Sequence, residues 1–495
     1  MLTSYLIIFI SLLSLYEILI LLFINKRLAI LSELVLVLYL SILIAIYSSS
    51  ILFIILFIYL NIYRILNILR GFKNNEYKKL IRTSVIKSSL RLNILILLIS
   101  FISFNNIGQS FSIRSIFEAL IFFSIFVIII FNLTTPKNIK KSKHIHKPIH
   151  YFDRDLPTVS VLIPARNETV DLEECLSSLL LSDYPKLEII VLDDCSVSKH
   201  TSEIIKNYAH AGVRFLAGNV PSNDWLAKNY AYQQLLDQSN GDLVLFCGVD
   251  VRFSSHTIRS LVEIFKTENY SMLSVIPKNN YTKNVNFSTL LYQPLRYAFE
   301  LTIPRYYLSR PPILSTLWLI KHETIDKLGG FKAVKRKVTP ESFFSRQILL
   351  SKKKYKLIKS DLSINLQSFK TSSEQKETAI RTYYPKLHRR LDLVSLITLF
   401  EFVVFIMPSL IFIYSILTSN LMTLYLSFFD ILLLILYYHQ LIRLTFDKTI
   451  IKYRLIVLFA VLIDIYIYNS SMIKYEFGSV YWKERNICIP VLYNH

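Results

Sequence analysis

Long apolar runs frame a polar middle segment, and this arrangement limits the possible folds more than any other feature of the chain. A membrane-spanning helix needs about 20 mostly apolar residues. Spans are expected at these positions: 3–24, 28–47, 50–69, 92–104, 113–133, 392–417, 420–438 and 453–470. Hydrophobic residues make up 53% of the chain and charged residues 18%, which excludes a disordered chain and disfavours a wholly soluble one. We therefore predict an integral, multi-pass membrane protein with a soluble insert.

The positions of the basic residues predict on which side of the membrane the insert lies. Lys and Arg gather in 26–27, 70–87 and 137–147, whereas the links 48–50 and 105–111 contain neither. Because basic loops stay in the cytoplasm, about five N-terminal spans put the insert there. The sequence leaves open on which side of the membrane the C-terminal tail lies. Three further spans put the tail outside, whereas an interfacial helix in place of one span keeps it inside.

The predicted organisation has five parts. They are N-terminal transmembrane helices (1–134), a basic linker (135–156), an α/β domain (157–390), C-terminal transmembrane or interfacial helices (391–473) and a tail (474–495). The net charge of +21 suits a membrane bilayer with anionic lipid, or phosphate ligands. Nucleic acid is disfavoured as a partner, since the basic residues flank apolar runs. The four cysteines have no spacing that indicates a disulfide framework or a zinc site.

The middle segment alternates short apolar strands with amphipathic helices. Strands are expected at 159–163, 188–192, 213–216, 242–246 and 272–276. Helices are expected near 172–180, 199–210, 225–237 and 256–267. This alternation predicts a Rossmann-like, mostly parallel sheet, in which ligands bind beyond the carboxyl ends of the strands.

Acidic residues follow the expected strand ends. Glu168, Asp193, Asp194 and Asp250 all come just after an apolar strand, so we expect them to line one crevice. The first strand is not followed by GxGxxG, and the chain contains no GxxxxGK[ST], which disfavours a dinucleotide site and a P-loop. Carboxylates at this edge instead suit a ribose, a base and a metal that carries a diphosphate.

Several motifs in fixed order resemble a known family. They are Val161–Glu168, Leu192–Ser196, Trp225–Lys228 and Val249–Phe253, followed by Leu328–Phe331 and Trp482–Arg485. Together they resemble family 2 (GT-A fold) membrane glycosyltransferases, in particular the branch with carotenoid and ceramide glucosyltransferases. The resemblance covers residues 157–390 and implies a GT-A domain in the cytoplasm, inserted between transmembrane helices.

The resemblance also implies roles for single residues. Those assigned to the nucleotide-sugar are Pro164, Ala165, Glu168, Asp193, Asp194, Trp225 and Lys228. Asp250 matches the second acid of a D-x-D motif that holds Mg²⁺ or Mn²⁺, and Glu341 matches the general base. Lys228 is expected beside the sugar or the diphosphate. Arg381, Trp482 and Arg485 match further recurring positions. Simpler roles stay open: Asp193 and Asp194 can cap a helix, and so can Glu341.

The sequence departs from the family pattern at two places that matter for chemistry. Gly248 replaces the first acid of the D-x-D motif. Pro340 replaces the first acid of the E-D pair, whose second position is held by the expected base, Glu341. A Q-x-x-R-W segment, typical of processive polysaccharide synthases, is missing from the sequence. The resemblance thus implies transfer of one hexose, with inversion, from a nucleotide-sugar donor (a UDP-sugar is expected) to a lipid acceptor. Three alternatives remain: a polyprenyl-phosphate sugar synthase, a nucleotide-binding or lipid-binding pseudoenzyme without turnover, and a transporter with a regulatory domain. The transporter is disfavoured, because five spans before the insert and three after it do not form paired inverted repeats.

Overall fold

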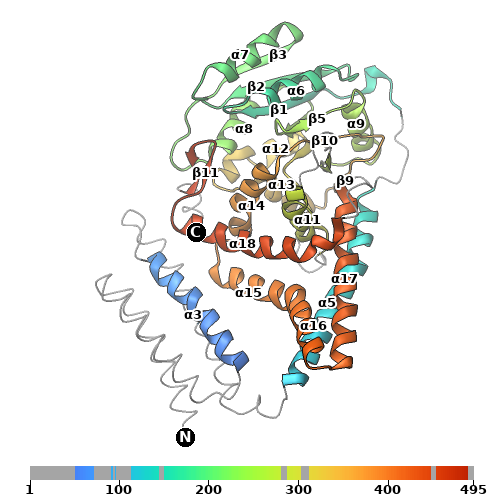
Figure 1. The fold of residues 1–495 in the computed structure, drawn as a ribbon. Coiled ribbons are helices and arrows are strands. Elements are labelled where there is room, and N and C mark those ends of the chain that lie inside the picture. Colours follow the sequence, from blue (N-terminus) through green and yellow to red (C-terminus); the bar gives the residue numbers. More distant parts are fainter. Residues whose placement is uncertain are drawn as a thin grey trace.

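The computed structural model describes residues 51–71, 91, 92, 95, 113–143, 150–279, 287–302, 311–446 and 453–488. The spans expected at 3–24 and 28–47 lie outside these residues, as does most of the one expected at 92–104. The described residues form an α/β domain above a group of long apolar helices (Figure 1).

The core of the domain is a seven-stranded sheet of order β3-β2-β1-β4-β8-β6-β9. Its strands are β1 (Val159–Ala165), β2 (Leu187–Asp193), β3 (Val213–Ala217), β4 (Leu243–Cys247), β6 (Met272–Ile276), β8 (Leu317–Lys321) and β9 (Tyr355–Lys359). β1 pairs in parallel with β2 and β4, whereas β8 runs antiparallel between β4 and β6. The five expected strands and the mostly parallel α/β fold class are confirmed. The sequence did not predict β8 and β9.

Both faces of this sheet are buried, as expected for parallel strands. Helices α6 (Val170–Leu180) and α9 (Thr257–Thr267) pack in a cluster with Val161 and Ile163. Leu162 points to the opposite face, into a cluster with residues of α8 (Ala227–Asp237) and α13 (Pro340–Leu350). Successive strand residues alternate between faces, so an apolar run without polar alternation gives a strand covered on both sides.

A small three-stranded sheet lies beside the main one and has the order β5-β10-β7. It consists of β5 (Val251–Arg252), β7 (Lys278–Asn279) and β10 (Gln367–Ser368). Ser368 pairs with Val251, directly after Asp250. Segments more than a hundred residues apart in the chain therefore meet next to the carboxyl end of β4.

Within the described residues, four helices are long and apolar enough to cross a membrane: Ile116–Lys141, Leu391–Leu417, Leu421–Thr445 and Tyr453–Glu476. They correspond to the runs expected at 113–133, 392–417, 420–438 and 453–470. The element bounds are α5 (Ile113–Lys141), α15 (Leu391–Glu401), the π-helical turn η5 (Phe402–Ile406), α16 (Met407–Leu417), α17 (Leu421–Thr445) and α18 (Val457–Glu476). α3 (Ile51–Gly71) covers the run expected at 50–69.

α18 has a different orientation from α5 and α17. Figure 1 shows α5 and α17 side by side, whereas α18 lies beside them at a steep angle, beneath the α/β domain. Along its length α18 contacts α14 (Ser372–Lys386), the last helix of the domain. Tyr383 Oη donates to Asp464 Oδ1 at 2.8 Å, and Tyr475 Oη donates to the carbonyl of Arg381 at 2.7 Å. The chain then continues into a hairpin, β11 (Tyr481–Trp482) and β12 (Arg485–Asn486), that lies against the domain.

Candidate active site

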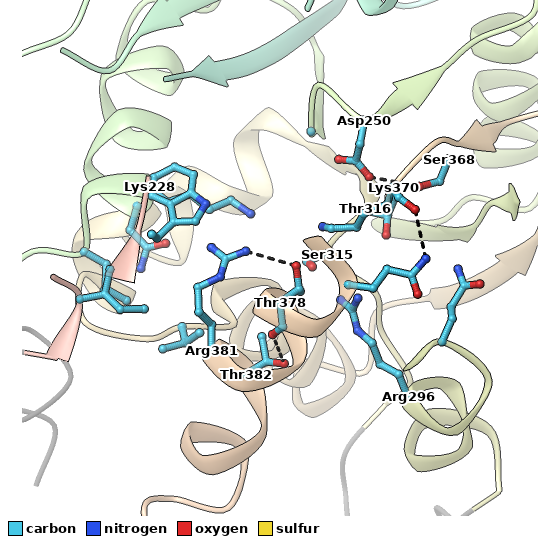
Figure 2. A pocket seen from close by; sticks show the side chains of 18 of the residues that line it. Lys228, Asp250, Arg296, Ser315, Thr316, Ser368, Lys370, Thr378, Arg381 and Thr382 are labelled. Carbon is cyan, nitrogen blue, oxygen red and sulfur yellow. Dashed lines mark hydrogen bonds between the residues drawn. The ribbon is translucent and has the colours of Figure 1, made fainter. Parts of the chain in front are cut away.

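A cavity lies between the carboxyl edge of the sheet, α11 (Pro294–Leu301), α14 and the C-terminal hairpin. Figure 2 shows side chains from these separate elements around one space. Its charged lining residues are Lys228, Asp250, Arg296, Lys370 and Arg381. The remaining lining is mixed, with hydroxyls such as Thr378 and the ring of Trp482.

Asp250 is the one carboxylate among the described lining residues. It follows β4 by three residues, and its Oδ2 accepts a hydrogen bond of 3.1 Å from Ser368 Oγ. Burial alone would raise the pKa of Asp250, but Lys370, Ser368 and Lys228 together hold that pKa below its usual value. Asp250 is therefore ionised at neutral pH, and the positive charges of two lysines favour that form.

Lys228 and Glu341 influence each other's pKa at this site, although they do not form an ion pair. Lys228 lies in the first turn of α8, and burial lowers its pKa while Glu341 opposes that shift. Glu341 lies in the first turn of α13, which Pro340 begins. It is only 4% exposed, and burial raises the pKa of Glu341, an effect that Lys228 partly offsets. Glu341 is thus near Lys228 but does not line the cavity itself.

Of the other predicted acids, Asp193 binds a neighbouring serine, whereas Asp194 and Glu168 contact the C-terminal hairpin. Asp193 accepts hydrogen bonds from Ser196 N at 3.0 Å and from Ser196 Oγ at 2.6 Å. Asp194 is buried and accepts a hydrogen bond of 2.7 Å from Arg485 Nη1. Glu168 is paired with Lys483 Nζ at 2.8 Å. The carboxylates of Glu168 and Asp194 are therefore partners of the hairpin in this structure.

The hairpin joins these acids to the cavity. Its turn residues Lys483 and Glu484 have φ angles of 47° and 69°, as a tight two-residue hairpin turn requires. On one side of the turn, Trp482 lines the cavity, and the Arg381 guanidinium carbon lies 5.6 Å from its ring centroid. On the other, Arg485 reaches Asp194, 291 residues earlier in the chain.

Of the residues predicted from the sequence, the cavity lining includes Lys228, Asp250, Arg381 and Trp482. Pro164 and Ala165 end β1, where Ala165 lies in register with Asp193. Trp225 packs edge-on against Tyr230, with ring centroids 5.4 Å apart. These three residues are outside the lining.

Sequence reasoning missed two cations of the cavity, Arg296 and Lys370. Neither belongs to a recognisable motif. Lys370 lines the cavity because β10 pairs with β5, and Arg296 lines it from α11. Both placements depend on contacts between distant segments, which local patterns do not report.

The Arg485–Asp194 contact leads to a prediction about stability. Arg485→Met is expected to lower the free energy of unfolding by about 1–3 kcal/mol, because Asp194 stays buried after losing two donated hydrogen bonds. The loss should shrink as the pH falls and Asp194 takes up a proton. The measurement is an SDS titration in mixed micelles. Arg154→Met, at a side chain that is 83% exposed, is the control, and equal midpoints for the two variants would contradict the prediction.

The residues around Asp250 are a poor match for a divalent ion. Mg²⁺ prefers an octahedral set of oxygen ligands. Among the residues that the structure describes, no group of three or more His, Cys, Asp or Glu side chains could hold a metal. A Cβ at Gly248 would lie 2.6 Å from Asp250 Oδ1, so the Asp250 carboxylate folds over the position where a second acid would start. The charges of Lys228 and Lys370 both act on this carboxylate and lower its pKa. The protein therefore offers one carboxylate beside two cations.

Comparison with known proteins identifies the class. Residues 160–340 match the family described as Glycosyl transferase family 2. The chain therefore contains a family 2 glycosyltransferase domain, which confirms the resemblance seen in the sequence.

Relatives and solved structures are similar over parts of the chain. A 4,4'-diaponeurosporenoate glycosyltransferase of Staphylococcus haemolyticus is 30% identical over 24% of this chain and 32% of the relative. A GalNAc(5)-diNAcBac-PP-undecaprenol beta-1,3-glucosyltransferase of Campylobacter jejuni is 32% identical over 22% of this chain and 34% of the relative. The matched segments thus span about a third of these relatives. A mannosyltransferase of Pyrobaculum calidifontis, solved with GDP-Man and Mn²⁺, is 15% identical with a TM-score of 0.40, over 64% of this chain and 85% of that one.

Proposed function

We propose that this protein transfers one hexose from a nucleotide-sugar, with a UDP-sugar as the expected donor, to a lipid acceptor at the cytoplasmic face of the membrane. The configuration at the anomeric carbon inverts. The observation that carries the proposal is the cavity in which Lys228, Asp250 and Arg381 meet at the carboxyl edge of the sheet. Its wall is α14, which packs on the apolar helix α18. A lipid head group can therefore reach the cavity while its tail stays in the bilayer.

We assign separate roles in this reaction to the residues of the site. The bond between the anomeric carbon and the diphosphate breaks, and its electron pair stays on the diphosphate oxygen. Lys228 stabilises that developing charge, since it is held in a partly dry site. Glu341 accepts the proton of an attacking hydroxyl. Asp193, Pro164 and Ala165, at the ends of β1 and β2, are proposed to contact the nucleoside.

The other assignments from the resemblance have narrower proposed roles. Glu168 and Asp194 are engaged by Lys483 and Arg485, so we assign them to holding the hairpin over the nucleoside. Trp225 supports the first turn of α8. The Mg²⁺ or Mn²⁺ ion implied by the resemblance has Asp250 as its one proposed protein ligand. Because the surrounding residues do not fit such an ion, no step of the mechanism is assigned to it.

A lipid phosphate is the second candidate acceptor. Glu341 is buried and outside the cavity lining, which weakens its access to an acceptor hydroxyl. An ionised phosphate oxygen attacks without a base, so a polyprenyl-phosphate sugar synthase would tolerate this arrangement. A pseudoenzyme is the third candidate, and Gly248 and Pro340 are the departures that favour it.

A donor screen on the full chain in lipid nanodiscs tests the proposal. UDP-hexoses and GDP-hexoses are offered with membrane lipid extract, and released nucleoside diphosphate and glycolipid are measured. We expect release with one donor and a product one hexose heavier than a neutral lipid. A hexosyl phospholipid product would instead support the synthase. If no donor releases nucleotide above the level of Asp250→Asn, the pseudoenzyme is correct.

Labelling of single cysteines tests the topology. The contact between the hairpin and the α/β domain supports our proposal that both lie on the same side of the membrane, with α18 along the interface. In a Cys195→Ser background the other cysteines are buried. Cysteines at Tyr481, which is 58% exposed, and at the exposed Lys332 are then expected to react with an impermeant maleimide only after the cells are opened. Labelling of either site in intact cells would contradict a cytoplasmic domain and tail.

A further inference from the structure

We infer that four side-chain cations hold the donor diphosphate and take over the charge neutralisation that a divalent ion would provide. They are Lys228, Arg296, Lys370 and Arg381. This inference rests on the proposed function, since it assigns the diphosphate of the same donor to this cavity. It goes further because it predicts that the protein binds and uses its donor without a metal.

The first observation is an excess of positive charge in the cavity. Four cations and one carboxylate, Asp250, line it. Within the described part of the chain, none of the four cations has a carboxylate within ion-pair distance. Arg381 donates from Nη2 to Thr378 Oγ1 at 3.2 Å, and its Nε is buried without a hydrogen-bond partner. A buried donor without a partner is costly, so the site is built for an anion that brings several acceptor oxygens.

The second observation is the convergence of these cations from different elements. They come from α8, α11, the segment after β10, and α14. Figure 2 shows Lys228, Arg296 and Arg381 entering the same space from three sides, with Lys370 next to Asp250. Long side chains of one charge repel one another, and a fold that gathers them gains stability when a multiply charged anion binds.

The mutual influence of the cations agrees with this geometry. Burial, Arg296 and Arg381 lower the pKa of Lys370 to about 8, although Asp250 opposes them. Burial is also the main reason that the pKa of Arg381 falls to about 10. A bound diphosphate would reverse these shifts, because a nearby anion favours the charged form of a cation.

The third observation is the chemistry around Asp250. A metal ion on this carboxylate would lie beside the ammonium groups of Lys228 and Lys370, which already interact with it, and Gly248 supplies no second acid. A divalent ion there meets repulsion from both lysines. The cations themselves match the ligand: guanidinium groups bind phosphate oxygens in a bidentate way, and lysine acts as a point charge.

Nucleotide binding to the full chain in nanodiscs tests this inference. The probes are UDP and GDP, titrated calorimetrically in EDTA, in Mg²⁺ and in Mn²⁺. For the nucleotide that binds, we expect Kd values in EDTA and in metal that agree within about threefold. Lys370→Met should weaken binding about tenfold or more in EDTA, whereas Lys370→Arg should restore most of it. Lys332→Met, which removes an exposed charge outside the cavity, should have no effect.

Each other result overturns the inference in a recognisable way. Nucleotide binding that appears only with Mg²⁺ or Mn²⁺ would mean that the diphosphate site needs a divalent ion, and it would leave the proposed glycosyltransferase function intact. Metal-free binding that Lys370→Met does not weaken removes Lys370 from the diphosphate site. If neither nucleotide binds under any condition, both the inference and the proposed donor class fail. If Lys370→Met does not fold, the salt dependence of wild-type binding in EDTA decides, since charge pairing predicts that affinity falls steeply with salt.

Discussion

Glu341→Gln is expected to lower kcat by about 10²–10⁴-fold with a hydroxyl acceptor, the contribution typical of a general base. The reason is that glutamine keeps the size of the side chain but cannot take the acceptor proton. Steady-state rates of nucleotide release with saturating donor and a neutral glycolipid precursor give the measurement. Glu323→Gln, at a side chain that is 73% exposed, is the matched control and should keep the wild-type rate.

The pH profile supplies an independent reading of the same residue. Burial raises the pKa of Glu341 above its ordinary value, and only the ionised form accepts a proton. The wild-type kcat should therefore be full at neutral and higher pH, and it should fall as the pH drops through this raised pKa. In Glu341→Gln this acid limb should disappear from whatever rate remains.

Three results would change the role assigned to Glu341. If Glu341→Gln keeps the wild-type rate with a hydroxyl acceptor, Glu341 is not the base. If the variant keeps the wild-type rate with a lipid phosphate acceptor, the result supports the synthase. If Glu341→Gln weakens UDP binding more than it lowers kcat, the carboxylate acts by positioning Lys228. That outcome fits its burial behind the lining residues and its influence on the pKa of Lys228.

Local sequence signals predicted the parts of the fold that depend on local chemistry. The apolar runs 159–163 and 188–192 located β1 and β2, although these strands extend to Ala165 and Asp193. The amphipathic pattern of α6 keeps Leu172, Leu176 and Leu179 on one buried face. β8 escaped prediction because its place between β4 and β6 is decided by strand pairing. For the C-terminal helices the sequence left open whether one of them is interfacial, and it did not identify α18 as that helix. Its apolar composition allows a span, but contacts with α14 hold it at a steep angle to α5 and α17.

The site shows the same division between local and distant determinants. Lys228 and Asp250 were found because each follows a strand or begins a helix at a family-like position. Arg296 and Lys370 enter the cavity through pairing and packing between distant segments. The ion pair between Arg485 and Asp194 also joins segments 291 residues apart. The sequence motif therefore marked Arg485 as a candidate residue but did not identify Asp194 as its partner.

Asp250→Asn separates the two accounts of the diphosphate site. We expect kcat to fall by about 10²–10³-fold, because the ammonium groups of Lys370 and Lys228 lose the carboxylate that orients them against the leaving diphosphate. UDP affinity in EDTA should stay the same or increase, since the substitution removes a negative charge next to the diphosphate. If Asp250 instead held a divalent ion, the same substitution would weaken UDP binding in Mg²⁺.

The measurement pairs single-turnover sugar transfer with UDP titration for wild type, Asp250→Asn and the exposed control Asp326→Asn. Lower kcat with unweakened UDP binding supports the four-cation site, because binding and chemistry then respond to Asp250 in opposite ways. Lower kcat together with Mg²⁺-dependent loss of UDP binding means that Asp250 carries a metal despite Gly248. Wild-type turnover in Asp250→Asn would remove this carboxylate from the reaction, and with it the reason to locate sugar transfer in this cavity.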